Sequence, residues 1–285
     1  MQALQNEDMP AKEFIYNWII KNCTTKATEY LLVQTLQTQA KNYLETGEYT
    51  KATELYNKAM TIGSDEDYYQ IKCDVLLGLG MVFYHTEQFD KEEAYNKKSL
   101  LLAQKYNYKK GIGNAKLQQA SDLIGNDNQT SKDTFNLIFK TMNECLNLWK
   151  EIKDTSRIIH TCINMGQYYA EYQYFDSALH YMKSAESYFS AFKYETVDFY
   201  YFILGKIYHQ KGINNKNNRK DFEEAVNNFK KCLPIAKQMN NKKREAWCYD
   251  WLANTYERIG NHEQAYIYLG KHSYLYGSIV AEDNF

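Results

Sequence analysis

The chain has 285 residues, of which only 2 are proline and 13 glycine, and its 34 basic and 35 acidic side chains leave a net charge of −1. This balance excludes a strong overall positive field of the kind that attracts nucleic acid. No apolar run approaches the roughly 18 residues that a membrane-spanning helix needs. With 44% hydrophobic residues and few helix breakers, the composition is typical of a continuous helical array, and it predicts no nucleic-acid and no membrane partner.

The first eight residues are polar and lack the basic-then-apolar layout of a secretory signal. We therefore expect residues 1–8 to be disordered and the chain to be cytoplasmic. From Pro10, which suits the first turn of a helix, apolar side chains recur at helical spacing. They are Phe14, Ile15, Trp18, Ile19 and Cys23. This stretch predicts a helix that caps the array, followed by a second helix that begins near Thr24 or Thr25.

Residues 36–59 carry the first clear repeat. Its small and bulky residues are spaced as in two helices that meet through small side chains, and Gly47 supplies the break between them. They are Leu36, Ala40, Tyr43, Gly47, Tyr49, Ala52, Tyr56 and Ala59. The pattern resembles the tetratricopeptide repeat, in which a bulky residue, Leu, Gly or Ala, and Tyr mark the first helix. Ala, an aromatic residue and Ala mark the second helix of that family.

The second copy keeps the first-helix pattern and departs from it in the second helix. The matching residues are Leu76, Leu79, Gly80, Phe83 and Phe89. Glu92, Asn96 and Ser99 stand where small, aromatic and small residues are expected, whereas Ala94 and Tyr95 suggest a shifted register. The sequence predicts a helix here and leaves the two registers open.

Four further copies follow along the chain. The third is divergent, with a first helix around Ala120 and a long second helix over residues 135–149. The fourth, over residues 165–185, is the clearest, and we expect its Gly166 to be a close-packing position. In the fifth, the polar run 212–220 reads as an insertion longer than the usual turn, and the sixth covers residues 251–272.

The small first-helix residues of the six copies lie 39 to 48 residues apart, whereas the basic tetratricopeptide unit has about 34. They are Ala40, Gly80, Ala120, Gly166, Gly205 and Ala253. The longer period resembles the repeats of bacterial cytosolic receptors for signalling peptides and of LGN-type scaffold proteins. The resemblance implies an all-α fold over residues 9–285. We expect one right-handed superhelical solenoid of about six antiparallel helix pairs plus the N-terminal capping helix.

Catalytic signatures are absent from the sequence. It contains no G-x-S-x-G elbow and no G-x-x-x-x-G-K-[ST] phosphate loop, and His262–Tyr266 begins like an H-E-x-x-H zinc helix but ends in tyrosine. The 6 cysteines are scattered singly with no C-x-x-C pair, which favours buried reduced thiols over disulfides or metal ligands. We therefore predict no enzyme, no cofactor and no metal site.

The family resemblance implies that the first helix of each pair lines a concave groove. Carried over residue by residue, the groove positions are Lys41, Met81, Tyr84, His85, Asn114, Asn164, Gln167, Glu171, Lys206, His209, Trp247, Asp250, Asn254 and Arg258. Amides suit both the donors and the acceptors of an extended peptide. Asn164 and Asn254 are the preferred pair, because related arrays place asparagine there to hold the ligand backbone. For each single residue, plain solvation is the alternative.

The predicted function is that of a non-catalytic adaptor or scaffold that binds a peptide or protein segment in the groove. The clamp by which some tetratricopeptide domains hold a chaperone's terminal carboxylate is not matched, since Gln37 stands where lysine is expected and Lys41 where asparagine is expected. The alternative is a peptide-sensing or regulatory domain of a longer bacterial signal-transduction protein, because residues 268–275 look similar to the end of such sensor regions. The sequence leaves the oligomeric state open.

Overall fold

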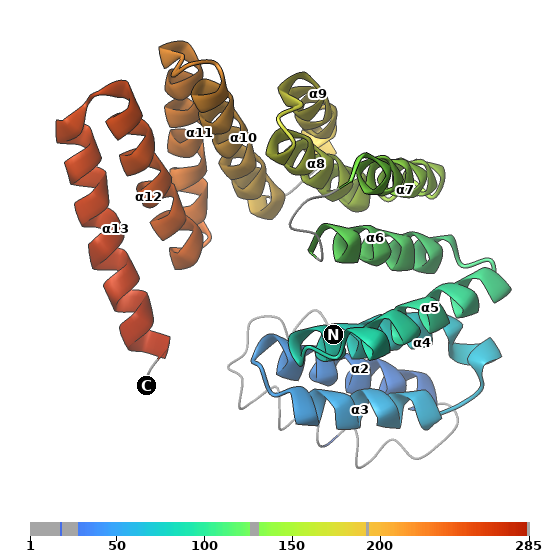
Figure 1. Ribbon diagram of the computed structural model, residues 1–285. Helices are drawn as coiled ribbons and strands as arrows, with labels where there is room; N and C mark the ends of the chain where they lie inside the picture. Colours follow the sequence, from blue (N-terminus) through green and yellow to red (C-terminus); the bar gives the residue numbers. More distant parts are fainter. Residues whose placement is uncertain (1–17, 19–27, 126–130, 192–193, 284–285) are drawn as a thin grey trace. The chain divides into compact units, whose positions relative to one another are not determined.

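A computed structural model describes residues 18, 28–125, 131–191 and 194–283. The predicted disordered start and most of the predicted capping helix lie outside the described residues. Those described form twelve α-helices, one short 3-10 helix and no strand, which confirms the all-α prediction (Figure 1). The α-helices are α2 (Glu29–Glu45), α3 (Tyr49–Thr61), α4 (Asp65–His85), α5 (Phe89–Lys105), α6 (Lys109–Gly125), α7 (Lys132–Glu151), α8 (Thr155–Glu171), α9 (Phe175–Glu186), α10 (Tyr194–Asn214), α11 (Arg219–Gln238), α12 (Lys242–Ile259) and α13 (His262–Asp283). None of these helices is long and apolar enough to cross a membrane.

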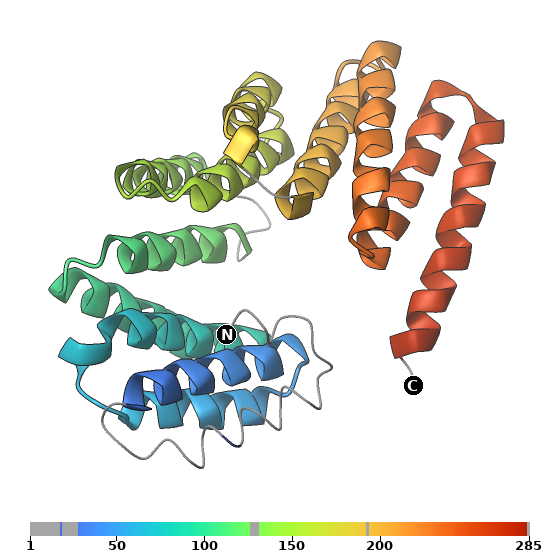
Figure 2. The same ribbon diagram turned by 180° about the vertical axis from the view of Figure 1, so that it is seen from behind.

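The chain divides into two compact units, Met1–Leu148 and Trp149–Phe285. In the first unit α2 pairs with α3 and α4 with α5, and α6 then packs against α5. The thiol of Cys145 on α7 lies 3.4 Å from the carbonyl oxygen of Gly113 on α6, so α7 covers α6 in turn. In the second unit α8 pairs with α9, α10 with α11 and α12 with α13, and the last four helices lie side by side in chain order (Figure 2). These pairs coincide with the predicted copies.

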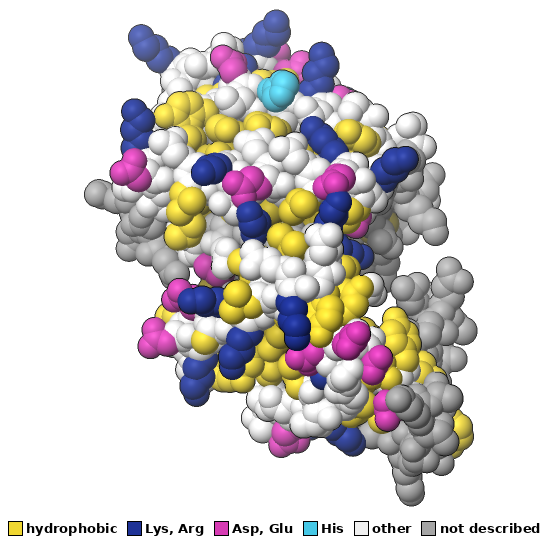
Figure 3. All heavy atoms as spheres, turned by 90° about the vertical axis from the view of Figure 1, so that its right-hand side faces the viewer, with side chains coloured by type: hydrophobic (Ala, Val, Ile, Leu, Met, Phe, Trp, Pro, Cys, Tyr) yellow, Lys and Arg dark blue, Asp and Glu magenta, His cyan; other side chains and the backbone are white. Residues whose placement is uncertain are grey.

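Charged side chains of both signs are mixed on the face that the space-filling view shows. Figure 3 shows one face of the molecule, on which Lys and Arg side chains alternate with Asp and Glu side chains and neither sign dominates a large area. This mixture agrees with the near-zero net charge.

One turn geometry recurs between the helices. At the end of α2, the amide of Glu48 donates to the carbonyl of Tyr43 at 2.8 Å and that of Gly47 donates to Leu44 at 3.2 Å. Such a pair of hydrogen bonds is the Schellman motif, which satisfies the last carbonyl groups of a helix and requires one residue with positive φ. The same pair of bonds ends α4, α5, α7, α8, α11 and α12.

Glycine occupies the positive-φ position in only two of these seven turns, Gly47 and Gly260. The break at Gly47 is confirmed, with φ of 80°. Elsewhere the left-handed residue is Glu87, Asn107, Lys153, Gln173 or Asn240. A side chain in this conformation is disfavoured by roughly 1 kcal/mol. The backbone hydrogen bonds and the packing of the helices on both sides therefore hold the turn without a glycine.

Small residues let the paired helices approach closely, as the sequence predicts. A β-carbon added at Gly166 on α8 would lie 2.8 Å from the Met182 sulfur on α9, and one at Gly205 on α10 would lie 2.6 Å from the Phe229 ring on α11. The alanines at the equivalent positions, Ala40, Ala120 and Ala253, are buried. The predicted close-packing role of Gly166 is confirmed.

We expect Gly166→Leu to lower the melting temperature through overpacking, at a cost of about 1–3 kcal/mol. The added side chain must displace Met182 or push α9 away from α8. Thermal unfolding followed by circular dichroism measures the change. Combining Gly166→Leu with Met182→Ala should recover part of the loss, whereas an unchanged melting temperature in the single variant would contradict close packing at this position.

The second helix of the second pair resolves the two open registers. Glu92, Asn96 and Ser99 on α5 are buried, with 4%, 1% and 0% of their surface exposed, and Ala94 is exposed. The shifted register is therefore wrong, and polar residues occupy the inward positions. A β-carbon added at Gly80 on α4 would lie 2.4 Å from the Asn96 side-chain oxygen on α5. At this point of the α4–α5 contact, α5 therefore contributes a polar side chain.

Two of the buried polar side chains of α5 find a partner on α6. The Asn96 amide donates to one carboxylate oxygen of Asp122 at 3.1 Å, and the Gln118 amide donates to the other at 2.8 Å. Burial, together with the charge of Asp122 and a hydrogen bond to it, raises the pKa of Glu92 to about 7. The α5–α6 contact therefore contains two neighbouring carboxyl groups and holds best when Glu92 is neutral.

The pKa of Glu92 predicts how stability depends on pH. Because this pKa is raised on folding, its contribution is present below about pH 4.5 and is lost as the pH rises toward 7. Glu92→Gln keeps a neutral hydrogen-bonding side chain, so we expect it to stabilise the fold by about 1–3 kcal/mol at pH 8 and to change little at pH 4. Urea unfolding at both pH values measures this, with Glu93→Gln at an exposed position of α5 as control. Equal stability of wild type and variant at pH 8 would contradict the argument.

Five of the six cysteines lie within the described residues, and all five are buried free thiols, as predicted. Burial raises the pKa of Cys73 to about 12 and that of Cys145 and Cys162 to about 11. Cys248 forms a hydrogen bond with Cys232, which together with burial raises its pKa. The sixth, Cys23, lies outside the described residues.

The polar run predicted as an insertion in the fifth copy is mostly helical. Helix α10 continues to Asn214 and α11 begins at Arg219, so only residues 215–218 form the loop. Asn218 caps α11 through a hydrogen bond from the Lys220 amide at 3.0 Å. The Asn215 amide donates to Asp221 at 3.0 Å, which ties the loop to the first turn of α11. The connection is longer than the turns 46–48, 86–88 and 172–174 of other pairs, as predicted, but part of the polar run extends the two helices and does not belong to the loop.

Candidate functional site

Three candidates of the first unit are neighbours on the exposed side of α4. Met81 and Tyr84 are 42% and 44% exposed, and His85 is exposed as well. The His85 ring stacks on Tyr49 of α3, with ring centroids 5.6 Å apart, and meets Tyr84 edge to face. This part of the predicted site is an aromatic cluster at the C-terminal end of α4.

The remaining two candidates of this unit lie apart from that cluster. Lys41 is exposed on α2 and forms an ion pair of 3.7 Å with Glu45, one turn along the same helix. Asn114 on α6 is half-buried, and its amide lies 3.5 Å from a carboxylate oxygen of Asp74 on α4. The first helices α4 and α6 therefore do share a polar contact, while Lys41 is engaged only with its own helix.

In the second unit the first helices α8, α10 and α12 pack in series, since α10 contacts both of the others. Asn164 and Gln167 are half-buried on α8, and the Gln167 amide donates to the exposed Glu171 at 2.9 Å. Asp250 accepts a hydrogen bond of 3.2 Å from Asn254, an exposed residue on α12. The predicted amide and carboxylate side chains are thus at least partly exposed on α8 and α12, the two first helices that contact α10.

Lys206 on α10 interacts with charged or aromatic side chains of both α8 and α12. Its ammonium nitrogen is 5.7 Å from the centre of the Trp251 ring of α12. Burial lowers the pKa of Lys206, Glu171 on α8 raises it, and Arg244 on α12 lowers it further. The cation is half-buried on an aromatic ring, where an incoming anionic group would gain more than in open water.

His209 is the most buried of the candidates, with 6% of its surface exposed. Its Nδ1 lies 2.9 Å from the Thr255 hydroxyl, and that hydroxyl donates its proton to the carbonyl of Trp251 at 2.6 Å. Because the single hydroxyl proton is used, Nδ1 of His209 carries a proton and donates. Burial, with a smaller effect of the Arg258 charge, lowers the pKa of His209 to about 4, so the ring is neutral at pH 7.

An open pocket of about 700 Å³ brings three of the candidates together. It is lined by His209, Asn217, Trp251, Asn254, Glu257 and Arg258. Asn217, which the sequence did not indicate, comes from the loop between α10 and α11 and has a φ of 62°. The left-handed conformation of this loop brings Asn217 to the pocket. The polar composition of the run did not predict that conformation.

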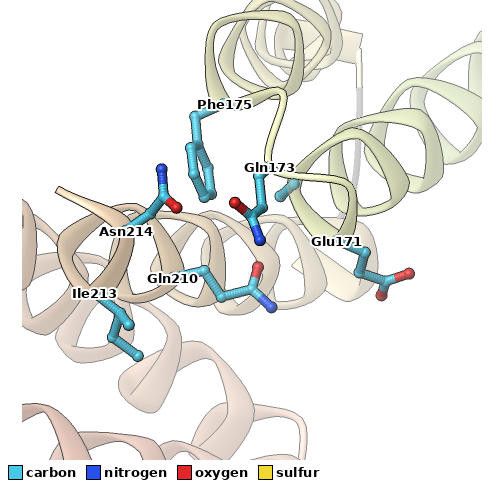
Figure 4. Close-up of a pocket in the computed structure, with 7 residues that line it drawn as sticks. Glu171, Gln173, Phe175, Gln210, Ile213 and Asn214 are labelled. Carbon is cyan, nitrogen blue, oxygen red and sulfur yellow. The ribbon is translucent and has the colours of Figure 1, made fainter.

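A smaller pocket of about 210 Å³ lies in the same unit, where the α8–α9 turn meets α10. It is lined by Ala170, Glu171, Gln173, Phe175, Gln210, Ile213 and Asn214. Figure 4 shows the amide groups of Gln173 and Gln210 facing each other, while the Glu171 carboxylate points away from them. Of the predicted residues only Glu171 belongs to this pocket.

Arg244 is a further residue of this face that the groove positions did not include. Its guanidinium lies 4.6 Å from the ring centre of Phe202 and 5.2 Å from that of Trp247, and it forms an ion pair of 3.4 Å with the buried Asp198. The predicted residue Trp247 is 47% exposed. Arg244 stands three positions before Trp247, a spacing that places both on one side of α12 and would have indicated it.

The lowered pKa of His209 predicts a loss of stability in acid. Because the folded pKa of about 4 lies below the ordinary value of 6.5, the contribution is present above pH 6.5 and is lost as the pH falls toward 4. We expect a loss of up to roughly 3 kcal/mol over this interval in the wild type. His209→Gln, which cannot titrate, should show a shallower fall in urea unfolding measured between pH 8 and 4. Parallel curves for the two proteins would contradict the neutral, buried histidine.

The fold defined by these helix pairs is a helical repeat of the tetratricopeptide type. The sequence itself matches no protein-family profile and no curated protein. The solved structures that are similar to the chain in fold include the following three. One is a Rap protein in complex with Competence and Sporulation Factor, which is 17% identical with a TM-score of 0.58, and the match covers 96% of this chain and 82% of that one.

A second similar structure is NprR in complex with its cognate peptide NprX, at 15% identity and a TM-score of 0.58, covering 95% of this chain and 75% of that one. The third is a signal-transduction ATPase with numerous domains from Pyrococcus horikoshii that has a tetratricopeptide repeat sensor, at 16% identity and a TM-score of 0.56. This match covers 95% of the present chain and 49% of the other, so the chain spans about half the length of that protein. At such identities the likeness shows the fold.

Proposed function

We propose that the face formed by α8, α10 and α12 is a non-catalytic binding site for an extended peptide or protein segment. The observation that carries the proposal is that three predicted residues of α10 and α12, His209, Asn254 and Arg258, line one pocket of about 700 Å³, and that α10 also contacts α8. The Rap and NprR structures, each in complex with a factor or peptide, support a binding role for this fold.

The chemistry of the face suits a peptide main chain. The amides of Asn164, Gln167 and Asn254 each offer donors and an acceptor, which match the alternating groups of an extended backbone. Trp247 and Trp251 supply apolar surface for ligand side chains, and aromatic residues are frequent anchors in binding sites. The Lys206 ammonium on the Trp251 ring favours a ligand with an acidic side chain.

The test begins with capture of ligands from the native source, using the full chain as bait and mass spectrometry to identify bound peptides. A captured peptide is then synthesised with a fluorescent label and titrated by anisotropy. Replacing Asn164 and Asn254 together with alanine should weaken its binding by about 1–3 kcal/mol through the lost backbone hydrogen bonds, with the fold intact.

Asn227→Ala is the matched control, because Asn227 is an exposed asparagine on α11, a second helix of the same unit. It should leave the affinity unchanged. If the double variant binds as tightly as wild type while circular dichroism shows intact helices, the two asparagines do not hold the ligand and the proposed face is wrong.

A sensor domain of a longer signalling protein is the second candidate function. The similarity to the Pyrococcus horikoshii protein, whose other half this chain does not cover, favours it. Sequencing the natural gene past the codon for Phe285 distinguishes the two, since an open frame that encodes an output domain supports the sensor. The cytoplasmic location stays a prediction.

A further inference from the structure

The last helix, α13, is buried on one side only. Ala265 and Ile279 are each 8% exposed, and the helix contacts its partner α12. His272 also faces inward, with its Nδ1 3.0 Å from the Ala246 carbonyl of α12. The Lys271 ammonium lies 5.8 Å from the Tyr249 ring of α12, so this cation is drawn toward the inner side as well.

The opposite side of α13 is apolar and uncharged over four turns. We call it the outer face of α13; it consists of Tyr266, Ile267, Gly270, Ser273, Tyr274, Gly277 and Val280, which share one side at 100° per residue. Tyr266 and Tyr274 are 79% and 83% exposed. An exposed apolar face of this extent is suited to contact with another protein surface.

The two glycines of the outer face differ from those of the core. No atom of the described residues lies within 4 Å of a β-carbon built on Gly270 or Gly277, whereas Gly166 and Gly205 each abut a side chain. Glycine is a poor helix former, and within the described chain no contact explains its use at these two positions. Both glycines leave room for a bulky side chain from outside.

The outer face is complementary to itself. About a midpoint between Ser273 and Tyr274, Gly270 stands opposite Gly277 and Ile267 opposite Val280. In an antiparallel two-fold contact, each Tyr274 would insert between Gly270 and Gly277 of the other copy as a knob enters a hole. The two-fold symmetry therefore brings the exposed Tyr274 ring of each copy against Gly270 and Gly277 of the other copy.

We propose that the outer face of α13 packs antiparallel against the same face of a second copy of this chain. Exposed tyrosines of this kind present roughly 150–200 Å² each, and the whole face about 500 Å². Two copies would bury about 1,000 Å², which lies at the lower limit of specific interfaces. We expect an interface of this small size to give a reversible dimer.

Sedimentation equilibrium of the full chain from roughly 1 to 200 µM, a range suited to a weak and reversible interface, tests the proposal. The mass should rise from 33.6 kDa toward twice that value. Tyr274→Arg should hold the mass at one chain throughout with unchanged circular dichroism, because the side chain is exposed in the single chain. Tyr174→Arg, at another exposed tyrosine of the second unit, is the control and should dimerise like wild type.

Cross-linking tests the symmetry. Ser273→Cys lies next to the expected two-fold axis, so a short bismaleimide should link two copies, whereas Asn227→Cys on α11 should give no linked dimer. A mass of one chain at the highest concentration overturns the proposal. A dimer that persists in Tyr274→Arg, or that Ser273→Cys does not link, places the interface elsewhere and overturns it too.

Discussion

The close approach of paired helices at one small residue governs the rest of this structure. At Gly166 and Gly205 the backbone of a first helix lies directly under a side chain of its second helix. This contact fixes how each pair packs, and the next pair then covers the apolar face that remains. The side of the first helix that faces away from its partner is left for polar residues such as Gln167 and Glu171. Packing and binding therefore use different sides of the same helix.

Much of the fold could be predicted from sequence because its determinants are local and periodic. Small and bulky residues at helical spacing mark the burial side of each helix. The turns were harder, since Glu87 and Gln173 adopt positive φ for reasons that lie in backbone hydrogen bonds and in neighbouring helices. The register at Glu92 could not be predicted either, because its partner Asp122 lies on a different helix and makes a polar inward position acceptable.

The candidate site, like the fold, was predictable where its residues share one helix and not where it depends on contacts between helices. Residues on one helix, such as Asn164 and Gln167, could be grouped by spacing alone. The pocket around His209 depends on a loop residue and on a hydrogen bond to Thr255 across helices, neither of which leaves a pattern in the sequence. Arg244 could have been predicted from its helical spacing to Trp247, but it was missed because the family's groove positions do not include it.

The buried thiols have a practical consequence for studying motion. Maleimide dyes react with exposed thiolates, whereas the five described native cysteines are buried, and burial raises the pKa of Cys162, for example, to about 11. A cysteine placed on an exposed position of each unit would therefore react far faster than these five. Once Cys23 is replaced, dye pairs can be attached with the helical core untouched, and energy transfer between them would report whether the distance between the two units changes when a ligand binds.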